Sequence, residues 1–493
     1  MNIDRIDRID GIGASDSPGA ARGFHDVAQF LARCRAAVGD RFVLTGADCA
    51  PYLTDWRGRF TGAALAVLRP DSTAQVAALV KICVEFGVPM VPQGGRTGLV
   101  LGSVPDASGS AVVLSLARLN RIRNIDPVNR TMTVDAGAIL HDVQAAAAAS
   151  ACLFPLSLAA EGSCSIGGNL STNAGGTAVL RYGNARELCL GLEVVTASGE
   201  IWDGLRTLRK DNTGYDLRDL FIGAEGTLGI ITGAVLKLFP RPKAALTALV
   251  ALDSAPQAVR LLLLAQDACG ASLTGFELMS HYCMALVRSH FPDLPRPIDK
   301  VHPYYVLLEV ASSESEAHAA SLLELALSSA FNDGVTADAV VSSNLAQSRG
   351  LWDIREHIPL AQAREGKNIK HDISLPVSAI PHFIETASAA LAARFPACQV
   401  VCFGHLGDGN LHFNVAPPAG MDADLFLDSE AAVNAVVYSE VQACHGSISA
   451  EHGVGAQKRD ALLLHKSAVE LALMRAIKQA LDPRNLMNPG KVL

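Results

Sequence analysis

Two histidines seven residues apart stand in a short, glycine-containing segment that could hold a metal ion. His405 and His412 lie in the apolar run 400–415, and a four-residue loop at 407–410 would place them opposite each other in a hairpin. Opposed side chains in an antiparallel pair have Cβ atoms about 4.5–5.5 Å apart, so both imidazoles could bind one ion. Glu451 would complete a set of two histidines and one glutamate, which leaves coordination positions open for a substrate. The alternative is a pair of histidines that only make hydrogen bonds on a sheet face.

Two neighbours of these candidate ligands could act on a bound substrate. Asn414 is two positions after His412 and therefore lies on the same strand face, which makes it a candidate substrate contact. His452 follows Glu451 directly and is our candidate general base for an alcohol proton. A divalent metal on the neighbouring ligands would lower the pKa of a bound hydroxyl group.

Segments much richer in glycine than their surroundings suit a pyrophosphate group. They span 92–99 and 162–169, and the second continues to 172–176. Glycine lets the backbone take positive φ and bring successive N–H groups close to an anion. A single loop of this kind is more often a tight turn, whereas two loops with Asn and Thr interleaved favour a nucleotide. A glycine pair at 11–13 has no strand before it and no Walker-type phosphate loop is present, which disfavours NAD and ATP.

The elements that must position these residues alternate between strands and helices. An apolar run after residue 63 leads to a helix capped by Ser72 and closed by Gly87, and a strand at 88–91 then enters the first glycine loop. Pro240-Arg241-Pro242 is predicted to separate two domains. Further strands are predicted at 111–114, 131–135, 193–196, 229–239, 247–251, 304–310 and 400–404, with helices at 255–268 and 313–329 and one helix after residue 450.

At 493 residues the chain is too long for one hydrophobic core. We predict an α+β protein with a mobile tail at 1–22, a nucleotide-binding domain at 23–240, and an α+β substrate (cap) domain at 241–449. A C-terminal helical segment at 450–493 is predicted to pack back on the nucleotide-binding domain.

Composition excludes several classes of function. A net charge of −8 with 5% aromatic residues argues against nucleic acid. The stretch 143–160 is too weakly apolar and too interrupted to span a membrane. The eleven cysteines form no close pair and follow no signal peptide, so we predict reduced thiols and a cytoplasmic location.

The glycine loops, together with 212–217 and 221–231, resemble the FAD-binding fold of the vanillyl-alcohol-oxidase type, and the resemblance covers roughly residues 63–493. Within that fold the chain is most similar to the D-2-hydroxyglutarate and D-lactate dehydrogenases. The resemblance implies a two-part FAD-binding domain, with the pyrophosphate of an extended FAD on the 94–98 loop and the isoalloxazine facing the cap domain. The first loop has no His or Cys for covalent attachment, and Cys164 alone is weak evidence for it, so non-covalent FAD is expected. The implied cofactor-binding residues are Pro92, Gly94, Gly95, Arg96, Thr97, Gly98, Leu99, Ser103, Gly162, Ser163, Gly167, Gly168, Asn169, Thr172, Asn173, Gly175, Gly176, Glu225, Gly226, Gly229, Ile230 and Asn488.

The segments 351–356 and 368–376 resemble the substrate-binding segments of that family. The resemblance implies that Arg355 grips the substrate carboxylate and that Lys370 adds a point charge. Glutarate-type relatives carry this lysine, so D-2-hydroxyglutarate is the expected substrate and D-lactate the alternative. Pro359 stands where the glutarate-type pattern has a threonine, which leaves the distal end of the pocket open.

These features together predict an FAD- and metal-dependent dehydrogenase of D-2-hydroxy acids. The resemblance places Zn²⁺, or else Mn²⁺, on the two histidines and the glutamate, and the hydride passes to flavin N5. No haem or iron–sulfur motif is present, so the electrons pass to an external acceptor such as an electron-transferring flavoprotein or a quinone. A metal-dependent hydrolase whose glycine loops are only turns stays open, as does a flavin-binding electron carrier without a substrate. The sequence is also compatible with a homodimer.

Overall fold

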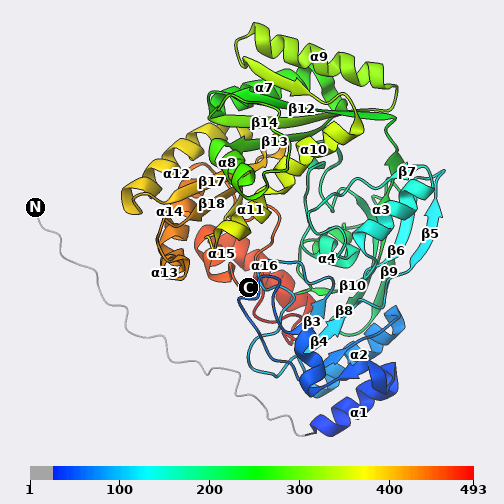
Figure 1. Ribbon diagram of the computed structural model, residues 1–493. Helices are drawn as coiled ribbons and strands as arrows, with labels where there is room; N and C mark the ends of the chain where they lie inside the picture. The colour runs from blue at the N-terminus through cyan, green and yellow to red at the C-terminus, as the bar shows by residue number, and fades with distance from the viewer. Residues whose placement is uncertain (1–25) are drawn as a thin grey trace, which may run out of the picture.

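The computed structural model describes residues 26–493, and the predicted tail at 1–22 lies outside the described residues. Figure 1 shows the first half of the chain below, the α+β cap above it, and the C-terminal helices returning to the lower part. Within residues 26–493, no helix combines the length and the apolar character that crossing a bilayer requires. The predicted α+β class is confirmed.

The first sheet has the strand order β1-β2-β4-β3, in which β2, β4 and β3 are parallel. Helix α2 packs against α1 and follows the prediction closely. Ser72 accepts a hydrogen bond from the Gln75 amide, and Gly87 ends the helix in the left-handed conformation. The elements are α1 Val27–Val38, η1 Asp40–Phe42, β1 Val43–Leu44, η2 Gly46–Tyr52, β2 Ala66–Leu68, α2 Thr73–Phe86, β3 Met90–Gln93 and β4 Val112–Ser115.

The second sheet has the order β5-β6-β10-β8-β9 and places the almost fully buried β10 at its centre. Its apolar residues join those of the first sheet in one hydrophobic cluster. The predicted strand at 229–239 is divided into β10 and β11, and β11 pairs with β7. The elements are β5 Ile122–Asp126, β6 Thr131–Asp135, α3 Leu140–Ala149, β7 Cys152–Leu153, α4 Ile166–Ser171, α5 Val179–Tyr182, β8 Cys189–Thr196, β9 Ile201–Gly204, α6 Arg218–Phe221, β10 Gly229–Lys237 and β11 Phe239–Pro240.

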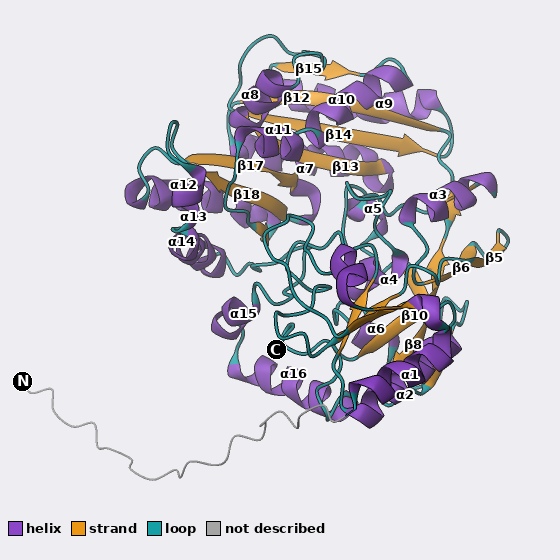
Figure 2. Ribbon diagram, turned by 60° about the horizontal axis from the view of Figure 1, so that its bottom comes forward, coloured by secondary structure: helices purple, strands orange, loops and turns teal. Residues whose placement is uncertain are grey.

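The cap is built on a seven-stranded sheet with the order β15-β12-β14-β13-β17-β18-β16, and helices cover both of its faces (Figure 2). The elements are β12 Ala244–Leu252, α7 Ala255–Cys269, η3 Gly270–Ser272, β13 Leu273–Ser280, α8 His281–His290, β14 Tyr304–Ser312, α9 Glu316–Asn332, β15 Asp338–Val341, α10 Leu345–Glu356, α11 Ile358–Glu365, β16 Asp372–Ser374, η4 Val377–Ala379, α12 Ile380–Arg394, β17 Gln399–His405, η5 Leu406–Asp408, β18 Asn410–Ala416, α13 Ala423–Leu427 and α14 Glu430–Ala443.

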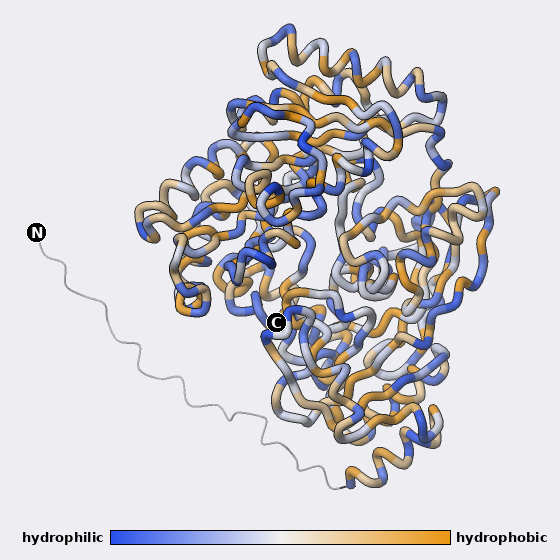
Figure 3. The backbone as a smooth tube through the Cα atoms, in the orientation of Figure 1, coloured by the Kyte–Doolittle hydropathy of each residue, from blue (hydrophilic) through white to orange (hydrophobic). Residues whose placement is uncertain are grey.

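Side chains of β12 alternate between two hydrophobic clusters on the two faces of the cap sheet. Val250 belongs to the cluster under α7, α9, α12 and α14, whereas Leu249 and Ala251 belong to the cluster under α8, α10 and α11. This alternation is the period of two expected for a strand buried on both faces. Helix α9 has one exposed face, and in Figure 3 it alternates between apolar and polar colours along its length.

The register of the β17–β18 hairpin corrects the predicted pairing of its histidines. His412 pairs with Phe403, not with His405, because η5 and Gly409 make a longer turn than the predicted loop. His405 instead pairs with Glu277 of β13. The two registers differ by two residues, and side chains two positions apart share a face, so both histidines still lie on the same face.

The C-terminal segment contains two helices, α15 Arg459–His465 and α16 Ala468–Leu481, where one was predicted. Met487 bridges to Met90 of β3, and Lys478 donates hydrogen bonds to the carbonyls of Thr227 and Met487. The segment therefore returns to the first half of the chain, as predicted.

Candidate active site

Three candidate metal ligands come together at the end of the β17–β18 hairpin. The ligand atoms of His405, His412 and Glu451 all lie within 4.8 Å of one another. His405 Nε2 is 3.6 Å from Glu451 Oε1, and the two histidine ring centroids are 6.0 Å apart. Two imidazole nitrogens and a carboxylate oxygen at this spacing fit a divalent cation with open coordination positions.

A buried carboxylate that the sequence analysis missed holds His405 in place. Glu277 has no exposed surface, and it accepts hydrogen bonds from His405 Nδ1 at 2.5 Å and from Arg355 Nε at 2.8 Å. Burial alone would raise the pKa of Glu277, but His405 and Arg355 outweigh burial and lower it to about 2. Burial favours neutral His405, but Glu277 prevails and raises the His405 pKa to about 9. Glu277 thereby directs Nε2 of His405 towards Glu451, as carboxylates behind metal-bound histidines do.

A second buried carboxylate, Asp372 of β16, positions the loop that carries Glu451 and His452. Its Oδ2 atom accepts hydrogen bonds from the backbone amides of Glu451 at 2.9 Å and His452 at 3.0 Å. Its Oδ1 atom accepts one from Asn410 Nδ2. Burial opposes ionisation, but His452, His412 and Lys458 hold the pKa of Asp372 well below its usual range. One charged group therefore orients a candidate ligand and the candidate base.

The candidate base and a candidate ligand lie face to face. The rings of His412 and His452 are stacked, with centroids 6.2 Å apart and planes inclined by 25°. Burial lowers the pKa of His412 to about 3, which keeps it neutral and able to bind a metal. Burial also lowers the pKa of His452, partly opposed by Asp372. A neutral imidazole can accept a proton, so His452 meets the first requirement of a general base.

The three residues predicted to bind substrate, Arg355, Lys370 and Asn414, lie in different surroundings. Arg355 of α10 is buried, with its guanidinium 4.8 Å from the Phe403 ring centroid and its Nε bound to Glu277. The amide of Asn414 is occupied inside the protein, since it donates to Gln362 and accepts from the His371 amide. Lys370 instead faces a cavity.

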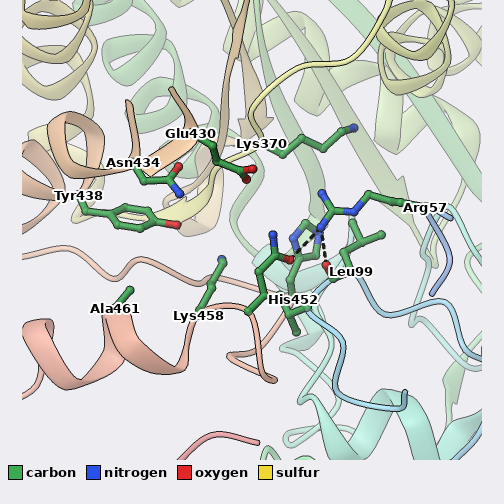
Figure 4. A pocket seen from close by; sticks show the side chains of 11 residues that line it. Arg57, Leu99, Lys370, Glu430, Asn434, Tyr438, His452, Lys458 and Ala461 are labelled. Carbon is green, nitrogen blue, oxygen red and sulfur yellow. Dashed lines mark hydrogen bonds between the residues drawn. The ribbon is translucent and has the colours of Figure 1, made fainter. Parts of the chain in front are cut away.

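The cavity beside His452 has a volume of about 70 Å³ (Figure 4). Leu99, the last residue of the first glycine loop, lines it together with Lys370 and His452. Arg57, which the sequence analysis did not single out, and Lys458 line it as well. Residues of the predicted cofactor loop, the substrate segment and the catalytic segment therefore meet at one space.

The two glycine loops are in direct contact with each other. A Cβ atom added to Gly94 would lie 2.2 Å from Ser165 Oγ, and one added to Gly95 would lie 2.0 Å from the Ser163 carbonyl oxygen. None of the glycines in these loops has positive φ, whereas Arg96 has a φ of 58°. The predicted positive φ is therefore absent at these glycines, whereas at Gly94 and Gly95 the second loop approaches too closely for a side chain.

The second loop also reaches the candidate metal ligands. A Cβ added to Gly175 would lie 2.8 Å from Glu451 Oε1, so a larger residue there would displace the carboxylate. The predicted nucleotide loop and the candidate metal site are thus immediate neighbours.

Other predicted cofactor-binding residues join these loops from distant parts of the sequence. Asn488 Nδ2 donates to the carbonyls of Gly102 and Glu225, and the Ser103 carbonyl accepts from Gln93. The carboxylate of Glu225 accepts hydrogen bonds from the backbone amides of the C-terminal segment at 454 and 455. Gly229 and Ile230 pair inside the second sheet.

Unpaired polar atoms in this region fit a bound nucleotide. Asn169 Nδ2, Asn488 Oδ1 and Gln93 Oε1 are buried and have no hydrogen-bond partner among the described residues. Buried polar groups without partners are rare in native proteins, and a ligand with phosphate and hydroxyl groups would supply partners. Open space lies above Gly98 and Gly162, where an added Cβ would meet nothing within 4 Å.

Comparison with known proteins agrees with this arrangement. Residues 64–204 match an FAD binding domain, and residues 241–492 match the C-terminal domain of FAD linked oxidases. The fold resembles p-cresol methylhydroxylase with substrate bound, with a TM-score of 0.76 at 18% identity over 94% of this chain and 96% of that one. The fold and the matching domains define an FAD-dependent oxidoreductase.

Relatives in the sequence comparison narrow this class. D-2-hydroxyglutarate dehydrogenase of Xanthomonas citri pv. viticola is 42% identical over 90% of this chain and 93% of its own length. The mitochondrial D-2-hydroxyglutarate dehydrogenase of Danio rerio is 40% identical over 89% of this chain and 80% of its own length. The chain belongs to the family of FAD-linked oxidases that contains these D-2-hydroxyglutarate dehydrogenases.

Proposed function

We propose that the protein oxidises D-2-hydroxyglutarate to 2-oxoglutarate with a non-covalent FAD and one divalent metal, most simply Zn²⁺. The observation that carries the proposal is the cluster of His405, His412 and Glu451 beside neutral His452, at a cavity that Lys370 lines. The relatives named for this reaction support the choice of substrate.

The residues of the chain divide the work of this reaction. When bound, the metal supplies a Lewis acid that lowers the pKa of the substrate hydroxyl, and the flavin supplies a hydride acceptor. His452 accepts the hydroxyl proton, and Asp372, 3.4 Å from His452 Nδ1, stabilises the imidazolium that forms. Arg355 and Lys370 bind substrate carboxylates, whereas the side-chain amide of Asn414 is occupied by Gln362 and the His371 amide.

The surroundings of Cys164, a thiol in the second glycine loop, support non-covalent FAD. Cys164 is buried, and burial raises its pKa, which disfavours the nucleophilic thiolate. We further propose that the residues after the Pro240-Arg241-Pro242 break form the cap domain, up to 449, and that 23–240 and 450–493 together hold FAD. The electrons then pass to an external acceptor, and the eleven free cysteines are consistent with a reducing, cytoplasmic location.

Oxidation of D-lactate is the second candidate function, and one residue favours it. Pro359 lies in the first turn of α11, where it offers neither a hydroxyl group nor an amide hydrogen to a distal carboxylate. A pocket that lacks this hydrogen bond to the distal carboxylate would prefer a dicarboxylate over a monocarboxylate such as D-lactate less strongly.

A dye-reduction screen across D- and L-2-hydroxy acids, with and without a chelator, tests the proposal. We expect yellow protein whose flavin is reduced by D-2-hydroxyglutarate, with the L-isomer inactive and the chelator abolishing turnover. A colourless protein would point to the metal hydrolase. Turnover that is insensitive to metal removal would refute the metal centre.

A further inference from the structure

A tight turn at 55–60 places Arg57, a cation from the first half of the chain, at the cavity beside His452. The buried carboxylate of Asp55 accepts hydrogen bonds from the amides of Arg57, Arg59 and Phe60 at 3.1, 2.7 and 2.7 Å. Arg59 then donates to the carbonyl of Asn368, two residues before Lys370. Asp55 is therefore a positioning residue for this turn, and the turn is held against the segment that carries the predicted substrate lysine.

The guanidinium of Arg57 has N–H groups that are not used in hydrogen bonds to the protein. Both of its hydrogen bonds use Nη2, which donates to the Leu99 carbonyl at 2.7 Å and to Gln457 Oε1 at 2.8 Å. Its Nε atom is buried and has no hydrogen-bond partner within residues 26–493. Figure 4 shows the guanidinium projecting into the cavity between Lys370 and His452. A planar guanidinium with free N–H groups suits a carboxylate, which can accept two parallel hydrogen bonds.

The charges around the cavity are unbalanced. Arg57, Lys370 and Lys458 line it, and Glu430 is the only acidic residue among its lining residues. Over residues 26–493, no ion pair involves any of these three cations; Lys458 donates only to the Ile448 carbonyl. Burial lowers the pKa of Lys370, and the neighbouring positive charge of Arg57 lowers it further. Cations that are at least partly buried and have no acidic partner are costly, and an anion between them would offset that cost.

We propose that Arg57 is a specificity-determining residue that binds the distal carboxylate of the substrate together with Lys370. This inference rests on the proposed function, because it requires a dicarboxylic 2-hydroxy acid whose other end lies at the candidate metal ligands. His452 lines the same cavity and stacks on His412, so one ligand can extend from the metal site past His452 to Arg57. Arg57 would supply the hydrogen bonds that Pro359 cannot.

Two substrates of the same length test whether Arg57 binds the distal carboxylate or affects activity in general. D-2-Hydroxyglutarate and D-2-hydroxyvalerate differ only at the distal end, which is a carboxylate in the first and a methyl group in the second. We expect Arg57→Gln to lower kcat/KM for D-2-hydroxyglutarate about ten- to a hundred-fold, the usual loss for a hydrogen bond between charged groups, and to change D-2-hydroxyvalerate less than two-fold. Arg57→Lys, which keeps the charge but not the planar fork, should lose an intermediate amount for D-2-hydroxyglutarate alone.

A binding measurement on the FAD- and metal-loaded protein gives a second readout. Titration of the flavin absorbance with 2-oxoglutarate should show a Kd raised by a similar factor in Arg57→Gln, and titration with 2-oxovalerate should show no change. Arg209→Gln is the matched control, since Arg209 also donates to a backbone carbonyl, that of Asn129, but does not line the cavity.

The outcomes distinguish the inference from the function on which it rests. Wild-type protein that oxidises both acids equally well, or neither, would refute the proposed dicarboxylate substrate. A wild-type preference for D-2-hydroxyglutarate, with Arg57→Gln lowering both substrates by the same factor, would leave the function standing and overturn the role of Arg57. A normal 2-oxoglutarate Kd in both Arg57 variants would overturn it as well.

Discussion

Substitution of Glu277 tests what positions the candidate metal ligand His405, because the carboxylate of Glu277 binds two side chains at once. Both oxygens accept hydrogen bonds, one from His405 and one from Arg355, in a fully buried position. In Glu277→Gln the side chain keeps its shape but offers one acceptor and one donor. If the amide oxygen faces His405, the amide NH₂ opposes the Arg355 N–H. If the amide is flipped, its NH₂ faces His405 Nδ1 and drives the imidazole proton to Nε2, the atom that must bind the metal.

The size of the effect follows from these two orientations. Loss of the partner behind a metal-bound histidine typically weakens metal binding 10- to 100-fold, which is about 1.4–2.7 kcal/mol. Removing one member of a buried ion pair destabilises a protein by about 3–5 kcal/mol, and the bond that glutamine retains should keep Glu277→Gln towards the lower end. We therefore expect weaker metal binding, a lower Tm and normal FAD content.

Metal affinity is measured by competition with a chelator on FAD-loaded protein. Glu309→Gln is the matched control, because Glu309 lies on the neighbouring strand β14 and also accepts two side-chain hydrogen bonds, from Thr274 and Trp352, away from the candidate ligands. A Kd for the metal that is unchanged in Glu277→Gln would refute the assigned role of Glu277. A loss of equal size in Glu309→Gln would assign the effect to the sheet in general.

Three further predictions concern the same site. Metal binding must displace a proton from His405, whose pKa Glu277 raises to about 9, so affinity should rise about tenfold per pH unit up to pH 9 and not above it. Burial also raises the pKa of Glu451, so a second displaced proton should steepen the profile at lower pH; a flat pH profile in a chelator titration would contradict the Glu277–His405 ion pair. In metal-free protein the same pair should stabilise the fold fully between about pH 4.5 and 6.5, because the pKa of Glu277 is lowered and that of His405 is raised. Its contribution should be lost as the pH rises through about 9, which urea unfolding at each pH would detect. Asp372→Asn should lower turnover and metal content together, since an amide keeps one acceptor oxygen and cannot accept from both Asn410 and the amides of residues 451 and 452. His452→Ala should lower turnover at least a hundredfold with metal content unchanged; metal analysis beside steady-state rates separates the two.

Local patterns in the sequence predicted the elements and the ligand set. Helix α2 carries its cap, its apolar face and its terminal glycine within sixteen residues, so no distant contact was needed to place it. The hairpin was predicted with the wrong partner for His412, yet its face was right because a strand repeats every two residues. The turn length decided the register, and the left-handed Gly409 after η5 could not be distinguished from a shorter loop by composition.

Residues that act through long-range contacts escaped the sequence analysis for a physical reason. Glu277 lies 128 positions before His405 and sits in an apolar strand whose pattern only predicts burial. Its signal was a charged residue inside a run of buried positions, which is rare unless the charge is paired. Asp372 had a stronger signal, since it stands two positions after Lys370 in a segment already assigned to the substrate. No local sequence pattern pointed to Arg57, because its neighbours in the cavity come from other parts of the chain.

The position of the candidate base depends on contacts from both halves of the molecule. Asp372 of the cap binds the loop amides at 451 and 452, and Glu225 of the first half binds those at 454 and 455. Gly453 lies between these two anchors with a φ of 77°, and a Cβ there would lie 2.7 Å from Glu225 Oε1. Only glycine meets both conditions without strain. Since each carboxylate fixes one side of the same five-residue loop, a shift of the cap relative to the FAD-binding half would move His452 away from the proton that it must accept.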